Sequence, residues 1–217
     1  MLKTIFFDLD GLILDSEKVY FKYWVEAGKR LGYNISEDVY LGLRSCDKQL
    51  AQKIVTEATG DSNAYFSIRN KRKELMNDYL KNNLFEIKPG VREFLEKLKL
   101  NIRAERVIVT SSFSDEKRKS LVENGILELF THIVSCIDVG KGKPYPDIYD
   151  FACKKTDTKK EDCIAFEDSP NGVISAYEAG IKVIMIPDLS TPEEKIVKKC
   201  KVFKNIEDSY PFIEKIQ

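Results

Sequence analysis

The chain has 217 residues, which at about 150 residues per domain predicts one or two domains. Lysine plus arginine and aspartate plus glutamate each number 35, so the formal net charge is zero, and this argues against a general nucleic-acid binder. No apolar run approaches the roughly 20 residues of a membrane span, and Asp8 comes too early for a signal peptide. We therefore expect a cytoplasmic protein with no nucleic-acid or membrane partner and no obligate protein partner.

The cysteine and histidine content limits the available chemistry. The five cysteines are scattered without a C-x-x-C pair, which indicates reduced thiols. The single histidine, His132, leaves almost nothing from which to build a histidine-rich zinc site or a Ser-His-Asp triad. Chemistry must therefore rest on carboxylates, lysines and hydroxyls.

Short runs rich in β-branched and aromatic residues alternate with helical patterns along most of the chain. The runs predict buried strands at 4–7, 106–110, 132–135, 163–166 and 182–186. The helical patterns lie at 91–100, 116–123, 148–155 and 170–179. This alternation predicts an α/β fold with a doubly wound, Rossmann-like parallel sheet, which binds ligands at the carboxyl ends of its strands.

The stretch from 15 to 85 breaks this rhythm because it contains no convincing strand. Asp15-Ser16 can cap a helix that runs to Leu31, and further helices are expected from Ser36, over 47–59 and over 64–81. A crossover between parallel strands usually needs only one helix. We therefore predict a core made of residues 1–14 and 86–217, with an inserted α-helical domain at 15–85.

Acidic residues follow two of the predicted strands. Asp8 and Asp10 share one side of the chain after the first strand, and Glu167-Asp168 follow the strand at 163–166. Close carboxylates repel one another unless a cation or proton lies between them, and Mg²⁺ prefers oxygen ligands. Each segment alone is equally compatible with a turn or a helix cap. Four carboxylates at the strand ends of one sheet favour a divalent cation.

Two further segments suit an anionic phosphate. Thr110-Ser111-Ser112 places hydroxyls and backbone N–H groups at a strand end, and Lys143 lies in a loop with glycines before it and Pro144 after it. The loop is not a Walker A sequence, because Ile137 and Pro144 stand where Gly and Ser or Thr are required. Capping hydroxyls and a solvated lysine remain the alternatives.

These four segments, in this order, resemble the haloacid dehalogenase-like hydrolase superfamily. Asp8-Leu9-Asp10-Gly11 matches its D-x-D motif, and the resemblance extends over essentially the whole chain. The segments at 143–147 and 167–172 are similar to the branch that contains β-phosphoglucomutase and sugar-phosphate phosphatases. In that branch the helical insert is called the cap, and it supplies substrate specificity.

The resemblance implies a Mg²⁺-dependent phosphatase that hydrolyses a small phosphate monoester, such as a sugar phosphate. Asp8 would be the nucleophile that forms an aspartyl-phosphate, and Asp10 the general acid and base. The resemblance also implies the remaining groups of the site. These are Asp8, Asp10 (through its backbone carbonyl), Asp168 and Glu167 at the metal, and Thr110, Ser111 and Lys143 at the phosphate.

The alternatives are a phosphosugar mutase, a phosphate-binding protein without catalysis and, less compatible with the large insert, a receiver-like signalling domain. The mutase resemblance would place a histidine where this chain has Tyr20, and its G-x-S-R loop reads Gly42-Leu43-Arg44-Ser45 here. Both departures favour hydrolysis. The expected specificity residues of the cap are Asp15, Tyr20, Gly42, Arg44 and Lys73. Trp24 is expected in the cap core, and most of the charged run 69–73 is expected on a solvated face.

Overall fold

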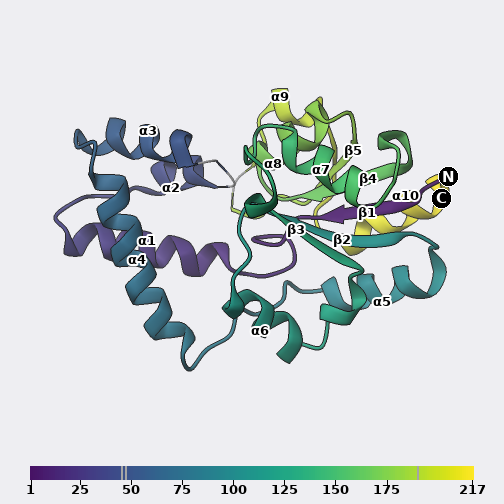
Figure 1. Ribbon diagram of the computed structural model, residues 1–217, viewed down its shortest axis with the longest axis horizontal. Coiled ribbons are helices and arrows are strands. Elements are labelled where there is room, and N and C mark those ends of the chain that lie inside the picture. Colours follow the sequence, from purple (N-terminus) through teal and green to yellow (C-terminus); the bar gives the residue numbers. More distant parts are fainter. Residues whose placement is uncertain (45, 47, 190) are drawn as a thin grey trace.

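The computed structural model describes residues 1–44, 46, 48–189 and 191–217 (Figure 1). Its centre is a parallel sheet in the order β3-β2-β1-β4-β5-β6. The strands are β1 (Thr4–Phe7), β2 (Glu105–Thr110), β3 (His132–Ser135), β4 (Cys163–Glu167), β5 (Lys182–Met185) and β6 (Lys201–Val202). The predicted doubly wound α/β fold is confirmed. Among the described strands, only the short, exposed edge strand β6 was not predicted, and the helices at 194–197 and 210–216 were not predicted either.

Helices cover both faces of the sheet (Figure 1). One face packs against α5 (Val91–Asn101), α6 (Asp115–Glu123) and α10 (Tyr210–Ile216), and the other against α7 (Asp147–Lys155), α8 (Pro170–Glu178) and α9 (Glu194–Val197). Side chains alternate along each strand, so Ile5 and Phe7 of β1 enter the first layer and Phe6 enters the second. Because both layers are apolar, the strands read as continuous apolar runs.

Four helices form a separate body beside the sheet (Figure 1), which we call the cap. They are α1 (Glu17–Arg30), α2 (Glu37–Leu43), α3 (Lys48–Thr59) and α4 (Ala64–Leu80). The cap has its own apolar cluster around Trp24, Tyr65 and Ile68. Its two connections to the core run side by side, where the Asp15 N–H donates to the Glu86 carbonyl oxygen at 2.8 Å. The division at 14/15 and 85/86 stays a prediction.

Short 3-10 turns complete the described elements: Leu127–Leu129, Cys136–Asp138, Lys160–Asp162 and Glu207–Ser209. Within the described part of the chain, no helix combines the length and the apolar character needed to cross a membrane. The expected start of the third cap helix at Asp47 and the last residue of the Gly42–Ser45 loop lie outside the described residues.

One expected helix cap is wrong in detail. Ser16 occupies the N-cap position of α1, but its side chain accepts no hydrogen bond from the helix. Its hydroxyl instead donates to Oδ1 of Asp10 at 2.7 Å. A serine that is expected to cap the N-terminus of a helix therefore orients an acid of the candidate site.

Candidate active site

The candidate site lies where β1 and β4 end next to each other. Phe7 pairs with Phe166 in the sheet, and the Asp8 N–H donates to the Phe166 carbonyl oxygen at 3.0 Å. Asp8 and Glu167 consequently emerge at the same edge. The strand order reverses here, since β2 and β4 lie on opposite sides of β1. Crevices at such a switch point are the usual ligand sites of doubly wound sheets.

Three carboxylates converge at this edge. Asp8, Glu167 and Asp168 are all buried, and each offers an oxygen within 4.8 Å of the other two. The fully buried Lys143 lies among them, with Nζ 2.5 Å from Asp8 Oδ1 and 2.7 Å from Glu167 Oε1. The hydroxyl of Tyr149, on α7, donates to the same Glu167 oxygen. The core therefore contributes three carboxyl groups and one ammonium group to this cluster.

Burial makes the ionised form of these acids costly. It raises the pKa of Asp8 although Lys143 opposes the shift, and it raises the pKa of Glu167 to about 7. The pKa of Asp168 rises well above its ordinary value for the same reason, against the attraction of Arg44. A cluster whose carboxylates all resist ionisation requires further positive charge to become fully anionic.

The donor set fits a hard divalent cation. Asp8 Oδ2, Glu167 Oε2 and Asp168 Oδ1 are buried and have no hydrogen-bond partner among the described residues. Buried carboxylate oxygens without a donor are unfavourable unless a cation or water satisfies them. Mg²⁺ binds carboxylate oxygens and carries the charge that the cluster lacks.

Gly11 allows the D-x-D turn to approach the second pair of acids. Its φ is +81°, a left-handed conformation that glycine adopts without penalty. A Cβ at this position would collide with the carboxylate of Asp168 and lie 3.0 Å from the Glu17 Cγ. A side chain here would therefore separate the two ends of the acid cluster.

Asp10 is held on both carboxylate oxygens. Ser16 donates to Oδ1, and the Lys117 ammonium lies 2.5 Å from Oδ2. Lys117 is buried and also donates to the backbone and side-chain oxygens of Ser112, at 2.9 and 2.8 Å. Burial lowers the pKa of Lys117, but Asp10 and Tyr20 together outweigh this effect and the net shift is upward. The lysine is therefore charged at neutral pH.

The predicted phosphate-binding hydroxyls lie at the end of β2. Thr110 is fully buried, and its hydroxyl donates to the Ser112 carbonyl oxygen at 3.0 Å while lying 3.5 Å from Asp10 Oδ2. Ser111 lines the same cavity as Asp8 and Asp10. The structure therefore brings Thr110 and Ser111 to the same edge as Lys143, which reaches the Val109 carbonyl oxygen at 3.2 Å.

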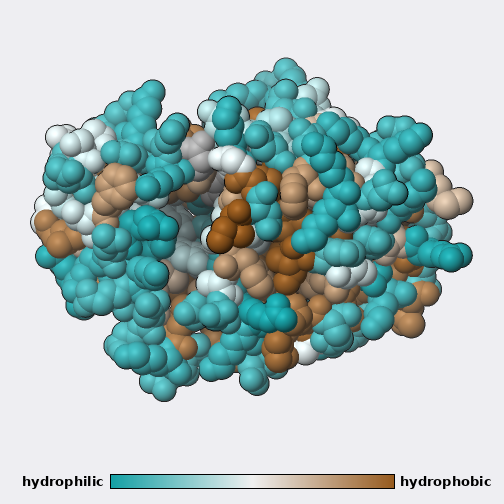
Figure 2. Space-filling model, in the orientation of Figure 1, coloured by the Kyte–Doolittle hydropathy of each residue, from teal (hydrophilic) through white to brown (hydrophobic). Residues whose placement is uncertain are grey.

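A cavity of about 210 Å³ separates the strand ends from the cap. The notch between the two bodies is visible in the space-filling view (Figure 2). Asp8, Asp10 and Ser111 line it from the core. The cap residues that line it are Glu17, Tyr20, Trp24, Tyr40, Leu43, Arg44, Cys46, Ala51, Tyr65, Arg69 and Arg72. Trp24 lies in the cap core, as expected, and reaches the cavity as well.

Arg44 connects the cap to the acid cluster. Its buried guanidinium pairs with the Asp168 carboxylate and lies 3.4 Å from Glu17 Oε2. The side chain of Asn171 donates to the Arg44 carbonyl oxygen at 2.8 Å, so backbone and side chain are both fixed. Glu17 Oε2, which lies next to Arg44, also accepts a hydrogen bond from the Tyr40 hydroxyl at 2.5 Å. Burial raises the Glu17 pKa to about 7 against the opposing effect of Arg44.

Three of the expected cap residues do not line the cavity. Asp15 lies at the connection between cap and core, with Lys18 at 2.8 Å and Lys88 at 3.4 Å. Gly42 faces the side chain of Ile54 inside the cap. Lys73 is exposed, because the side of α4 that lines the cavity carries Arg69 and Arg72 and not Lys73.

Several functional candidates carry no sequence motif. Lys117 and Arg72 each belong to runs of charged residues on a helix, where solvated faces are the usual interpretation. Arg69 is exposed, as expected for a solvated face, whereas Arg72 is half-buried, and both line the cavity. Glu17 is the first residue of α1, where an acid is typical in any helix. Helical periodicity places Arg69 and Arg72 on one face of the helix and Lys73 on another. It does not tell which of these faces points to the cavity.

Comparison with known proteins places this geometry in context. The model of a haloacid dehalogenase-like hydrolase family matches residues 5–186. A Drosophila melanogaster protein named "Probable pseudouridine-5'-phosphatase" is 33% identical over 215 residues, which cover 94% of this chain and 90% of that protein. The "Phosphorylated carbohydrates phosphatase" of Thermotoga maritima is 29% identical and covers 84% of each chain. The crystal structure of a hydrolase from Pseudomonas syringae shares the fold, with a TM-score of 0.81 at 21% identity over 99% of both chains.

Proposed function

The chain belongs to the haloacid dehalogenase-like hydrolase family and is a phosphoric monoester hydrolase, and from this premise we propose that it hydrolyses a small phosphorylated metabolite through an aspartyl-phosphate. The relatives named above carry the names of a probable pseudouridine-5'-phosphatase and of a phosphatase of phosphorylated carbohydrates, which supports a phosphorylated sugar or sugar derivative as the substrate. The required metal is Mg²⁺, and the site of action is the cytoplasm.

The observation that carries the proposal is the free oxygen of Asp8. Lys143 holds Oδ1, whereas Oδ2 has no hydrogen-bond partner, and the residue lines the cavity. In the first step Oδ2 attacks phosphorus, a new P–O bond forms, and the bond to the leaving alcohol breaks. Lys143 stays within reach of the phosphoryl oxygens and offsets their charge.

Asp10 supplies the proton transfers. Its carboxyl group gives a proton to the leaving oxygen and then accepts one from the water that cleaves the aspartyl-phosphate. The bonds from Ser16 and Lys117 orient the carboxylate for this second role. Thr110 and Ser111 are proposed to bind phosphoryl oxygens from the end of β2.

Glu167 and Asp168 are the side chains whose free oxygens would hold Mg²⁺, with the backbone carbonyl of Asp10 and the Asp8 carboxylate oxygen that does not attack phosphorus. When bound, the metal offsets the repulsion between Asp8 and an incoming phosphate dianion. Tyr149 and Lys143 fix one oxygen of Glu167, which leaves its second oxygen for the cation.

The proposal is tested with the Asp8→Asn variant and p-nitrophenyl phosphate in the presence of Mg²⁺. Activity is expected to fall at least 1,000-fold, on the order of the losses seen when a nucleophile is removed. Asp78→Asn is the matched control, because Asp78 is exposed and pairs with the likewise exposed Lys81. Unchanged activity in the Asp8 variant would show that another group attacks phosphorus.

Hydrolase and mutase are separated by their products. Release of inorganic phosphate from a monoester without a bisphosphate activator supports the hydrolase. Isomerisation that depends on a bisphosphate would instead establish the mutase. A panel of phosphate monoesters compared by kcat/KM identifies the substrate class.

A further inference from the structure

The cap wall of the cavity contains an arginine without an anionic partner. Arg72 lies on α4 and lines the cavity, with its guanidinium carbon 5.0 Å from the ring centre of Tyr20 and 5.2 Å from that of Trp24. Its Nε is buried without a hydrogen-bond partner. Among the ion pairs of the described residues, none includes Arg72. The side chain therefore faces the cavity as an uncompensated cation.

Such a cation is unfavourable in the substrate-free protein. Withdrawing a guanidinium from water costs free energy unless a counter-ion is present, and stacking on two aromatic rings offsets only part of that cost. Burial lowers the pKa of Arg72, which is the same cost expressed as a proton equilibrium. Arg69 lies one helical turn earlier on the same wall, so a second positive charge adds repulsion. An anion between the wall and the core would remove both penalties.

The two ends of the cavity have opposite character. The core end presents Asp8 and Asp10, which under the proposed function receive the phosphoryl group that is cleaved. Arg72 belongs to the facing wall, and it makes no ion pair with these acids. A ligand that occupies the whole cavity would therefore place one anionic group at Asp8 and another at Arg72.

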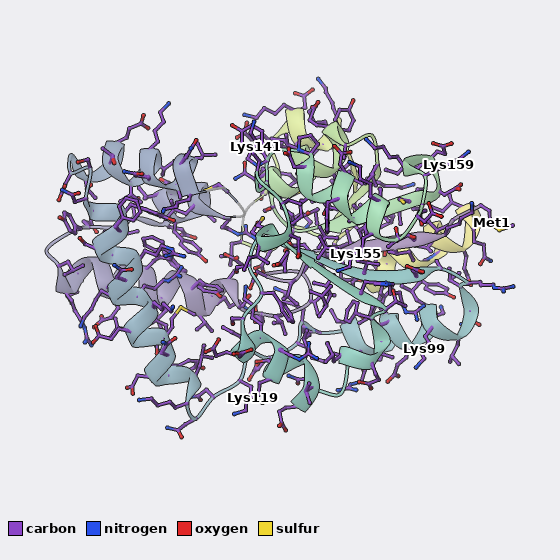
Figure 3. All side chains as sticks on the ribbon, in the orientation of Figure 1. Met1, Lys99, Lys119, Lys141, Lys155 and Lys159 are labelled. Atoms are coloured by element: carbon purple, nitrogen blue, oxygen red, sulfur yellow. The ribbon has the colours of Figure 1, made fainter. Side chains whose placement is uncertain are left out.

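A second, basic cavity of about 670 Å³ adjoins the first, and we call it the mouth. The two cavities share the lining residues Tyr65, Arg69 and Ser111. The described lining of the mouth includes Lys48, Arg69 and Lys141 but no acidic side chain. Figure 3 shows Lys141 at the end of the core that faces the cap. A lining of one sign raises the local concentration of ligands of the opposite sign.

We propose that the substrate carries a second anionic group, a carboxylate or a phosphate, at the end remote from the phosphoryl group that is cleaved, and that Arg72 binds it with Arg69 at the mouth. This inference rests on the proposed function, since Asp8 defines the other end. The inner cavity of about 210 Å³ restricts the substrate to a small metabolite.

Matched substrate pairs test the proposal on the full chain with Mg²⁺. 3-Phosphoglycerate and glycerol 3-phosphate differ by a carboxylate in place of a hydroxymethyl group, and fructose 1,6-bisphosphate and fructose 1-phosphate differ by a phosphate. The anionic member of at least one pair is expected to have a kcat/KM at least 10-fold higher. The responding pair identifies the second anion. Equal values within both pairs would overturn the proposal.

Variants assign the preference to the arginine. Arg72→Met is expected to reduce the ratio within the responding pair to between 1 and 3, and Arg72→Lys to keep part of it. Arg69→Met is expected to reduce the ratio several-fold without affecting the fold, because Arg69 is exposed. Lys53→Met removes the same charge from an exposed cap position and should leave the ratio unchanged. A ratio that survives both arginine variants contradicts the proposal.

A binding measurement separates this inference from the proposed function. Calorimetry on Asp8→Asn compares the affinity for the members of each pair without turnover, and Asp8→Asn combined with Arg72→Met repeats it. A preference for the anionic member that is lost in the double variant supports the inference even if p-nitrophenyl phosphate is not hydrolysed. Hydrolysis that depends on Asp8, together with no preference in binding, retains the proposed function and rejects the inference.

Discussion

The Lys117 ammonium lies 2.5 Å from Oδ2 of Asp10, and α6 thereby fixes the carboxylate that follows β1. Both groups are on the same side of the sheet edge, where Ser112 accepts two further hydrogen bonds from the lysine. Lys117 is 1% exposed, so water cannot take the place of its ammonium group unless the surrounding side chains move. We classify it as a positioning residue, because it acts on the reaction through Asp10.

Removal of Lys117 should slow the second chemical step more than the first. In Lys117→Met the carboxylate of Asp10 loses its ion pair, keeps its contact with Ser16 and is less well oriented toward the attacking water, whereas p-nitrophenolate leaves with little help from a proton. We expect kcat for p-nitrophenyl phosphate to fall about 10-fold or more. This is part of the rate enhancement of about 10²–10⁴-fold that general acid–base catalysis contributes. A pre-steady-state burst of p-nitrophenolate approaching one equivalent should accompany it.

The control for this experiment is Lys119→Met, on the exposed side of the same helix (Figure 3). It should show neither the reduced kcat nor the burst. A lower kcat without a burst in Lys117→Met would place the defect before the aspartyl-phosphate forms. That result would contradict the assigned role of the lysine.

Lys143 should be essential for stability as well as for activity. Its removal leaves Asp8 and Glu167 without their shared cation in a fully buried site. Breaking a buried ion pair by removing one partner costs about 3–5 kcal/mol. We expect Lys143→Met to lower the free energy of unfolding in urea by that amount in the presence of EDTA, and to abolish hydrolysis.

The compensating variant identifies the cause. Lys143→Met combined with Glu167→Gln removes one of the orphaned charges and should recover part of the lost stability, but no activity. The exposed Lys159 (Figure 3) provides the control as Lys159→Met. If the double variant is as unstable as the single one, lost packing rather than the unpaired charges explains the effect.

The fold was predictable because the strands are buried on both faces. Ile5, Phe6 and Phe7 contact apolar layers on either side, so the strand appears as a run that needs no phase information. The two-residue β6 is exposed and carries no such run. The N-cap role of Ser16 failed because a tertiary acceptor, Asp10, competes with the local one.

The site was predictable only where its chemistry adjoins a strand end. Asp8 and Asp168 are fixed by the sheet, so their sequence neighbours specify their position. Lys117 and Arg72 are selected by which side of a helix faces the site, and each sits among similar charges. The sequence contains no local difference that separates the buried Lys117 from the exposed Lys119, because the packing of α6 on the sheet makes that choice.

Mg²⁺ should stabilise the folded protein. A ligand that binds only the folded state at 100 times its dissociation constant adds about 2.7 kcal/mol. For a chain of this size, a gain of that order corresponds to a rise in Tm of about 5 °C or more. We expect this shift on adding Mg²⁺ to the EDTA-treated protein, and its loss in Asp168→Asn.

The same titration distinguishes a specific site from general ionic effects. The exposed-site variant Asp78→Asn should retain the full rise in Tm. An equal rise in Asp168→Asn would mean that the cation binds elsewhere.

Arg44 should compete with the metal for Asp168. The guanidinium pairs with one oxygen of that carboxylate, and its positive charge repels a nearby cation. Arg44→Met is therefore expected to lower the Mg²⁺ concentration at half-maximal stabilisation several-fold, as measured by the rise in Tm. Arg30→Met, which removes an exposed charge of the cap, is the control and should leave that concentration unchanged. A higher half-maximal concentration in Arg44→Met would show that the arginine supports the metal site instead.

Glu17 should make stability depend on pH in the metal-free protein. Burial raises its pKa to about 7 in the folded state from an ordinary value of 4.5. Between these values the folded state binds more protons than the unfolded state, so the free energy of unfolding falls as the pH rises. This rise in the Glu17 pKa corresponds to roughly 3 kcal/mol at most. In EDTA, the stability of Glu17→Gln relative to the parent protein should therefore increase between pH 5 and pH 8, whereas that of the exposed control Glu57→Gln should stay constant. A constant or decreasing difference for Glu17→Gln would show that Arg44 and Tyr40 stabilise the ionised form over this pH range.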